Sequence, residues 1–253
     1  MPRLTLLRPE DPPEHFPDPG QALESPNGLL ALGGDLSPGR LLAAYRRGIF
    51  PWYEHGQPIM WWSPDPRAIL LPDELHISRS LRRTLRSGRY TVSADHDFGG
   101  VITACAETRA VQGTWITAEM RAAYRQLHEL GHAHSIETWL GNRLVGGIYG
   151  IAIGQVFFGE SMFSTETDAS KVALVALVRQ LTGRGFGLLD CQIETGHLNS
   201  LGSRLIARTE FLRTVGRLTA SPEGEASWRS GPEPTQALAA CGNPRVRLRA
   251  KAT

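Results

Sequence analysis

Apolar side chains recur at helical spacing early in the chain and predict a short helix there. Leu41 and Tyr45 lie on one face of this helix. Ser37 is a typical N-cap before the face, and Gly48 follows its last turn. The next stretch is rich in tryptophan and proline, which favours a rigid, irregular aromatic surface. We therefore predict a small N-terminal domain that covers residues 1–70.

A basic helical pattern opens the second domain, which we predict to cover residues 71–220. Ile77, Leu81 and Leu85 recur at every fourth position. The remaining positions of the helix carry four arginines, Arg79, Arg82, Arg83 and Arg86. Arginine suits phosphate because its donors form a fixed fork. The helix is therefore a candidate nucleic-acid surface, although a solvated polar face has the same pattern.

Glycine-punctuated strand patterns follow two further predicted helices. The helices are expected at residues 98–105 and 118–130, and the strands at 133–140, 143–154 and 155–163. Short strands separated by Gly-Asn and Gly-Gln are typical of an antiparallel meander. A helical pattern at 165–185 and a strand at 186–194 come next. A strand, helix, strand sequence normally makes the two strands parallel, with a right-handed crossover.

Strand alternation predicts a polar cleft between these two strands. Glu160 shares one face with Phe158 and Met162, and Asp190 shares a face with Gln192. If the strands are neighbours, the two acids and the amide face one cleft. There they could handle protons and grip a cationic substrate. The alternative is a pair of polar strand faces that the N-terminal domain covers.

A Q-x-x-G-x-G motif suggests coenzyme A, but its position in the predicted structure does not. Gln180, Gly183 and Gly185 match the pattern that binds a pyrophosphate at a helix N-terminus. The residues before the motif are helical and those after it form a strand, so these glycines end a helix. The dipole at a helix C-terminus repels phosphate, and no coenzyme is predicted.

Histidine and cysteine patterns suggest a metal site and a thiol nucleophile. Three histidines are closely spaced, His128, His132 and His134. Gly131 ends the helix between the first two, which removes the zinc-binding geometry. Cys191 and His197 could act as nucleophile and base, but strand alternation turns Cys191 away from the predicted cleft. We therefore expect no metal and a buried, unreactive thiol.

Composition indicates an ordinary globular chain. Its 253 residues are 41% hydrophobic and 21% charged, with a net charge of +2, so affinity for polyanions must come from local patches. Three cysteines without metal-type spacing suit a reduced cytoplasmic protein. No run of about 18 apolar residues predicts a membrane span. Residues 221–253 lack periodicity and are expected to form a mostly disordered basic tail.

Several long blocks of the sequence resemble the bacterial leucyl/phenylalanyl-tRNA-protein transferases. They include PNGLLALGGDLSPGRLLAAYRRGIFPW, WWSPDPRAIL, HELGHAHSIE, FGESMFS and DCQ, in the family's order from Pro26 to Leu212. The resemblance implies an enzyme that takes leucine or phenylalanine, with methionine as a further candidate, from aminoacyl-tRNA. It joins the amino acid to the N-terminal arginine or lysine of a protein and so creates a degradation signal of the bacterial N-degron pathway.

The resemblance also implies an α+β fold and the roles of particular residues. It implies a small N-terminal domain and a GNAT-like acyltransferase domain, a mixed sheet flanked by helices that uses aminoacyl-tRNA in place of coenzyme A. It assigns catalysis to Glu160, Asp190 and Gln192, with a hypothetical proton path between Gln192 and Asp190. A larger set is expected to contact the aminoacyl group and the 3′ adenosine: Tyr45, Trp52, Trp115, Tyr124, Phe157, Met162, Leu177 and Leu181.

Three positions depart from related sequences. Leu177 and Leu181 stand where phenylalanine is usual, and Ile148 stands where methionine is common, so the pocket could differ in shape. Two other functions remain as alternatives. A non-catalytic tRNA-binding protein would bind tRNA without transfer, and a coenzyme A-dependent N-acetyltransferase would bind coenzyme A.

Overall fold

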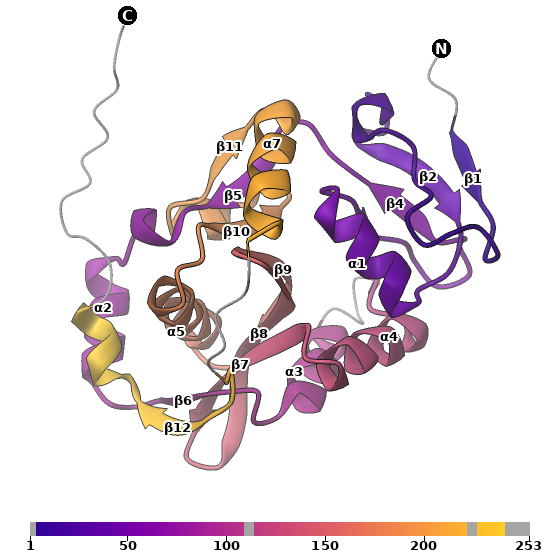
Figure 1. Ribbon diagram of the computed structural model, residues 1–253. Helices are drawn as coiled ribbons and strands as arrows, with labels where there is room; N and C mark the ends of the chain where they lie inside the picture. Colours follow the sequence, from indigo (N-terminus) through magenta and orange to yellow (C-terminus); the bar gives the residue numbers. More distant parts are fainter. Residues whose placement is uncertain (1–3, 109–113, 222–226, 241–253) are drawn as a thin grey trace, which may run out of the picture.

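The computed structural model shown in Figure 1 describes residues 4–108, 114–221 and 227–240. Within these ranges, a four-stranded sheet belongs to a small N-terminal unit, and an eight-stranded mixed sheet with flanking helices forms the larger unit. This arrangement confirms the predicted α+β class. None of the helices in the described ranges has the length and apolar character needed to cross a membrane.

The N-terminal unit combines helix α1 (Pro38–Arg46) with the small sheet. Its strands are β1 (Thr5–Leu7), β2 (Leu29–Gly33), β3 (Phe50–Pro51) and β4 (Met60–Trp62). As predicted, Ser37 caps α1, because its Oγ accepts a hydrogen bond from the backbone N–H of Arg40 at 3.4 Å. Trp61 is buried, and its indole N–H donates to the carbonyl oxygen of Gly33 at 2.8 Å. This bond ties β4 to β2.

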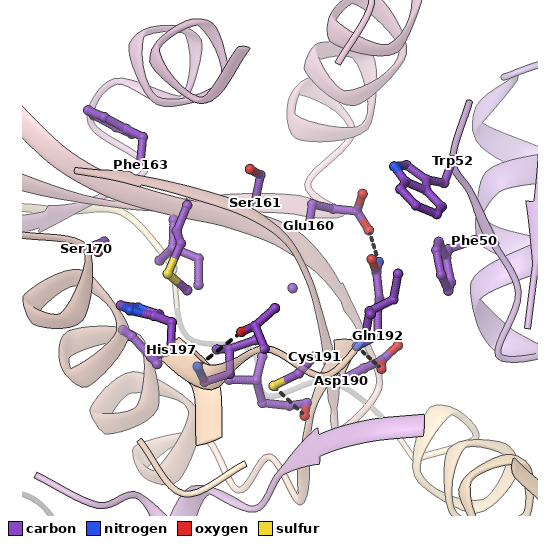
Figure 2. A pocket seen from close by; sticks show the side chains of 18 of the residues that line it. Phe50, Trp52, Glu160, Ser161, Phe163, Ser170, Asp190, Cys191, Gln192 and His197 are labelled. Atoms are coloured by element: carbon purple, nitrogen blue, oxygen red, sulfur yellow. Dashed lines mark hydrogen bonds between the residues drawn. The ribbon is translucent and has the colours of Figure 1, made fainter. Parts of the chain in front are cut away.

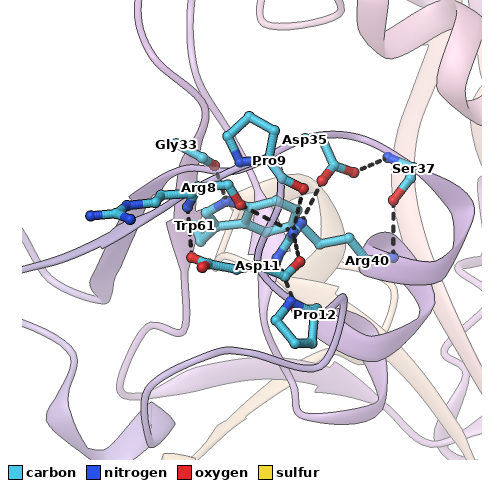
Figure 3. Close-up of polar contacts among 9 residues, drawn as sticks. All are labelled: Arg8, Pro9, Asp11, Pro12, Gly33, Asp35, Ser37, Arg40 and Trp61. Carbon is cyan, nitrogen blue, oxygen red and sulfur yellow. Dashed lines mark hydrogen bonds and ion pairs between the residues drawn. The ribbon is translucent and has the colours of Figure 1, made fainter.

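Arg40 is a fully buried charged side chain that attaches the N-terminal segment to α1 (Figure 3). Its Nε donates to Asp35 Oδ2 at 2.9 Å. Its other nitrogens donate, at 2.8 to 3.4 Å, to the carbonyl oxygens of four residues, Arg8, Pro9, Asp11 and Pro12. A buried charge is tolerated when it is paired and its donors are satisfied. Both conditions hold here.

Replacing Arg40 with methionine is therefore expected to destabilise the protein by about 3 to 5 kcal/mol, the usual cost of breaking a buried ion pair. The loss removes the guanidinium donors from the Asp35 carboxylate and from the four carbonyl oxygens, of which those of Arg8 and Pro12 keep a backbone donor. The measurement is the free energy of unfolding from denaturant titration. Arg46→Met on the same helix is the matched control, because Arg46 is exposed. Equal effects of the two substitutions would contradict the structural role of Arg40.

The large sheet has the strand order β11-β5-β10-β9-β8-β7-β6-β12. Its strands are β5 (Arg67–Leu70), β6 (Thr91–Ala94), β7 (Ala133–Leu140), β8 (Arg143–Ile153), β9 (Val156–Ser164), β10 (Leu188–Gln192), β11 (Arg204–Ile206) and β12 (Ser230–Pro234). The antiparallel meander β7-β8-β9 is confirmed. So is the parallel pairing of β9 with β10, which are joined through helix α5 (Ala169–Gly183).

Helices cover both faces of this sheet and form two buried apolar clusters with it. The other helices are α2 (Arg79–Arg86), α3 (Phe98–Glu107), α4 (Ala118–Glu129), α6 (Gly196–Asn199) and α7 (Arg208–Thr219). Helices α1, α3, α4 and α7 share one cluster, and α2 and α5 share the other. Along β8, Ile151 belongs to the first cluster and the next residue, Ala152, to the second, which is the alternation that a strand requires.

Two predicted boundaries require correction. Strand β5, at Arg67–Leu70, pairs with β10 and β11 of the large sheet, so the N-terminal unit ends before residue 70. The predicted tail is also wrong in part, because β12 pairs with β6 and a 3-10 helix, η4 (Thr235–Ala240), packs against α2. Leu238 is buried there, and Trp228 stacks on His134 with ring centroids 4.1 Å apart. The rest of the predicted tail, residues 222–226 and 241–253, lies outside the described residues.

Candidate active site

A cavity of about 600 Å³ lies where β9 and β10 separate (Figure 2). The two strands pair from Val156 opposite Leu188 to Phe158 opposite Asp190, while β9 continues to Ser164. One part of the cavity wall is apolar and includes Ile148, Met162, Leu174, Leu189 and Leu198. Another part is aromatic and polar and includes Phe50, Trp52, Trp115, Glu160 and Gln192. The cavity can therefore hold an apolar group beside a polar reacting centre.

Glu160 occupies a bulge of β9. Tyr149 of β8 lies opposite Ser161, and the next residue, Gly150, lies opposite Gly159, so Glu160 is the extra residue between them. A bulge breaks the alternation of side chains and redirects the residue that it contains. The prediction that Glu160 and Met162 share a face is therefore wrong. Glu160 points to α1 and α4, whereas Met162 packs against the cluster of α5.

The Glu160 carboxylate is buried and receives three hydrogen bonds. Tyr45 Oη lies 2.6 Å from Oε1, Tyr124 Oη lies 2.8 Å from Oε2, and Gln192 Nε2 lies 2.7 Å from Oε1. Burial raises the pKa of Glu160 to about 7, with a further increase from the charge of Asp190, although the three hydrogen bonds act in the opposite direction. Glu160 can therefore gain and lose a proton near neutral pH.

Asp190 forms a fully buried ion pair with Arg67, which sequence reasoning did not identify. Arg67 Nε and Nη2 donate to its two carboxylate oxygens at 2.8 and 2.7 Å. The same guanidinium lies over the rings of Phe50 and Phe211, at 4.7 and 4.5 Å from their centroids. Such a bidentate pair stabilises the ionised carboxylate. Asp190 is therefore held firmly by Arg67 and suited to fix the position of its neighbours.

Gln192 links the two acids. Its backbone N–H donates to Asp190 Oδ1 at 2.9 Å, and its side-chain amide donates to Glu160. Its φ of 60° lies in the left-handed region, next to a register shift between β10 and β5, so the surrounding contacts must hold this conformation. The sequence correctly predicted that these three residues meet. The alternative prediction, that the N-terminal domain covers the polar strand faces, was also partly right, because Tyr45 of the N-terminal unit covers Glu160.

Three of the eight predicted aminoacyl and adenosine contacts line the cavity: Trp52, Trp115 and Met162. Tyr45 and Tyr124 are fully buried behind Glu160 and do not line it. Phe157, Leu177 and Leu181 are buried in the second apolar cluster, behind the cavity wall. The prediction that these five residues contact the ligand directly is thus not supported by the geometry. Alternation and spacing identified apolar positions without showing which layer each one occupies.

Several residues of the cavity wall were not predicted from the sequence as part of the site. They include Phe50, Ser161, Leu174, Leu189 and His197. Phe50 lies shortly after the first predicted helix, within the first of the sequence blocks quoted above. Cys191 also lines the cavity, contrary to prediction, but burial raises the pKa of its thiol well above the usual range, with a further increase from the charge of Asp190. A protonated thiol is a poor nucleophile.

The Q-x-x-G-x-G motif and two of the closely spaced histidines lie in structural positions. Helix α5 ends at Gly183, so the Q-x-x-G-x-G motif lies at a helix C-terminus as predicted. His128 Nδ1 lies 2.8 Å from the carbonyl oxygen of Ala133, and His134 Nδ1 lies 2.7 Å from Asp95 Oδ2. These contacts give both histidines a role in packing.

The arginines of α2 divide into an exposed face and a structural contact. Arg79, Arg83 and Arg86 are exposed, and their spacing places them on one face of the helix. Arg82 is partly buried, and its guanidinium donates to the carbonyl oxygen of Ala239 in η4. Arg82 thus has one nitrogen engaged within the fold, whereas Arg79, Arg83 and Arg86 present their side chains to solvent.

Comparison with known proteins gives a consistent result. The profile of the leucyl/phenylalanyl-tRNA protein transferase family matches residues 69–216, and that of the family's N-terminal domain matches residues 34–65. The leucyl/phenylalanyl-tRNA–protein transferase of Nitrosomonas eutropha is 56% identical over 84% of this chain and 92% of its own length. That of Pseudomonas entomophila is 59% identical over 84% of this chain and 94% of its own length.

Solved structures show a weaker likeness. A conserved protein from Bacteroides thetaiotaomicron aligns with 76% of this chain and 65% of its own, at 13% identity and a TM-score of 0.35. At that TM-score the alignment supports no argument about function. The sequence comparisons are independent of it.

Proposed function

The chain belongs to the leucyl/phenylalanyl-tRNA–protein transferase family. We propose that, in this cavity, it transfers leucine or phenylalanine from aminoacyl-tRNA to the N-terminal arginine or lysine of a protein. The reaction forms a peptide bond and frees the 3′ oxygen of the tRNA. The observation that supports this site most strongly is the position of Gln192, which is bonded to both Asp190 and Glu160 at the border of the apolar and aromatic walls.

The apolar wall suits the side chain of the donor amino acid. Ile148, Met162, Leu174 and Leu189 offer an aliphatic or aromatic side chain a place away from water. Trp52 and Trp115 lie on the aromatic wall and suit the 3′ adenosine, since stacking of a base on an aromatic ring contributes about 1 to 3 kcal/mol. The ester carbonyl would then lie near Gln192, between the two walls.

The polar residues suit the attack of an amine on that carbonyl. An α-amine has a pKa of about 8, so a fraction of the acceptor molecules carries an unprotonated amine at neutral pH. The enzyme then needs chiefly to orient this amine and to accept the one proton that it loses on attack. The Gln192 amide can orient the amine, with Asp190 and Arg67 fixing the backbone of Gln192. Glu160 is the group whose pKa, about 7, matches the proton transfer. Its ionised form also favours a cationic acceptor.

Transfer of labelled leucine to short peptides tests this proposal. We expect labelling of peptides that begin with arginine or lysine and none of an otherwise identical peptide that begins with alanine. Labelled acetyl-coenzyme A in place of leucyl-tRNA should label neither peptide. Binding of tRNA without labelling of any peptide would favour a non-catalytic tRNA-binding protein, and labelling from acetyl-coenzyme A would favour an acetyltransferase.

We also propose that the exposed face of α2, formed by Arg79, Arg83 and Arg86, contacts tRNA phosphates. Replacing all three with glutamine should weaken tRNA binding and reduce the slope of log affinity against log salt by about one for each phosphate that is no longer neutralised. Binding titrations over a range of salt concentrations measure both effects. Arg213→Gln with Arg217→Gln is the control, because both arginines are exposed on α7. An unchanged salt slope in the triple variant would rule out this role of α2.

A further inference from the structure

Tyr45, Tyr124 and Glu160 form a triangle of polar atoms beside the cavity. Tyr45 Oη lies 2.5 Å from Tyr124 Oη, and the two phenols lie 2.6 and 2.8 Å from the two carboxyl oxygens of Glu160. Tyr45 comes from α1, Tyr124 from α4 and Glu160 from the bulge of β9. All three sides of the triangle are therefore of hydrogen-bonding length.

The number of protons available decides how these contacts can form. A phenol has one proton to donate, and an ionised carboxylate has none. Burial and the charge of Glu160 raise the pKa of both phenols, so Tyr45 and Tyr124 keep their protons. Two protons cannot make three hydrogen bonds. With Glu160 ionised, one of the three contacts must therefore lack a proton; if both phenols donate to the carboxylate, it is the 2.5 Å contact between their own oxygens.

We infer that Tyr45, Tyr124 and Glu160 form a closed ring of three hydrogen bonds that holds a proton on Glu160, and that this ring accepts the proton which the acceptor amine loses during transfer. The second part rests on the proposed function, whereas the ring itself does not. Tyr45 and Tyr124 are then positioning residues that act through Glu160. This role replaces the contact with the aminoacyl group that was predicted for them.

Gln192 determines the direction of the ring. Its amide already donates to Glu160 Oε1, so the acidic proton belongs on Oε2. From Oε2 it is donated to Tyr124, Tyr124 donates to Tyr45, and Tyr45 donates to Oε1. Each phenol then donates once and accepts once. The other titratable and charged groups that act on this set are Tyr149 of β8 and the Asp190 carboxylate, which Arg67 neutralises.

The proton balance of the transfer fits such a ring. The amine nitrogen forms a bond to the ester carbonyl carbon, the bond from that carbon to the 3′ oxygen breaks, and one N–H proton leaves the nitrogen. Ionised Glu160 accepts this proton, and the ring closes. The ring then gives one proton to the 3′ oxygen, which leaves as a hydroxyl group. With a neutral amine, Glu160 ends in the state in which it began.

Infrared difference spectroscopy of the full-length protein without substrate tests the ring directly. Between about pH 5 and about pH 9, we expect the carbonyl stretch of a protonated carboxylic acid to disappear with a midpoint near 7. The band should be absent from Glu160→Gln and shifted in Tyr124→Phe, which removes the acceptor of the acidic proton. Identical difference spectra of wild type and Glu160→Gln would overturn the ring.

A double-mutant cycle on the same midpoint separates a ring from two independent donors. In a ring, either Tyr45→Phe or Tyr124→Phe interrupts the hydrogen bond between the phenols, so the shifts of the single variants should not add up to that of the double variant. Additive shifts would contradict the ring. Tyr90→Phe is the matched control, because Tyr90 is buried and donates to the carbonyl oxygen of Thr167. It should leave the midpoint unchanged.

The spectroscopic and transfer measurements fail independently. Normal transfer without the titrating band would remove the ring and leave the proposed function in place. The band without any transfer from leucyl-tRNA would leave the ring and remove its proposed use.

Discussion

Replacing Arg67 with methionine is expected to destabilise the protein by about 3 to 5 kcal/mol and to abolish transfer, because it leaves the Asp190 carboxylate buried without its partner. Arg67 also lies between the rings of Phe50 and Phe211 and donates to the carbonyl oxygen of Gly48 at 3.2 Å. One side chain thus joins the N-terminal unit, α7 and the site. Denaturant unfolding and peptide labelling measure the two effects.

A double variant separates the structural part of this effect from the chemical part. Asp190→Asn alone leaves Arg67 as an unpaired buried charge and should also be destabilising. Arg67→Met combined with Asp190→Asn removes both charges and should recover most of the stability. The asparagine oxygen can still accept the backbone N–H of Gln192, so we expect part of the transfer activity to return.

Recovered stability without recovered activity would contradict a positioning role for Asp190 and favour a role as a base. Arg204→Met is the matched control for removal of an arginine. Its ion pair with Glu74, at 3.1 Å, is partly exposed. Such a pair contributes at most about 1 kcal/mol.

Wild type should lose stability relative to Glu160→Gln as the pH rises from about 4.5 to about 7. Burial raises the pKa of Glu160 from 4.5 to about 7, so within this window the folded protein holds a proton that the unfolded chain has released. Stability falls with pH wherever the folded state binds more protons. A shift of this size corresponds to a change of about 3 kcal/mol across the window.

The measurement is the free energy of unfolding of both proteins at several pH values, compared by slope. Glu166→Gln serves as the control, because Glu166 is a partly exposed residue with ion pairs to Arg89 and Arg143. It should not reproduce the difference. Parallel pH profiles of wild type and Glu160→Gln would contradict a raised pKa. Transfer by Glu160→Gln should also fall by about 10² to 10⁴ if Glu160 handles the proton.

Hydrophobic periodicity and capping residues predicted the main elements of the fold, because these signals are local. Ser37 identified the start of α1, and glycine-punctuated strands identified the β7-β8-β9 meander. The crossover through α5 brought Glu160, Asp190 and Gln192 together as predicted. Strand β12 was missed because its five residues, SGPEP, have neither alternation nor strand-forming side chains, and its pairing with β6 comes from tertiary contacts.

The functional details that the sequence could not predict arise from two irregularities in the strands. The bulge at Glu160 and the left-handed backbone of Gln192 change which way side chains point, and neither leaves a signal in the order of polar and apolar residues. The partners of the site residues are also distant in sequence. Arg67 meets Asp190, and Tyr45 meets Tyr124, only because the sheet and the N-terminal unit assemble around them.

The proposed transfer is tested most directly by the mass of its product. A peptide that begins with arginine is incubated with the purified protein and leucyl-tRNA and then sequenced by tandem mass spectrometry. We expect one added leucine residue, joined through a peptide bond to the α-amine of the arginine. An unmodified peptide, or leucine attached to any other group, would contradict the proposed transfer at this cavity.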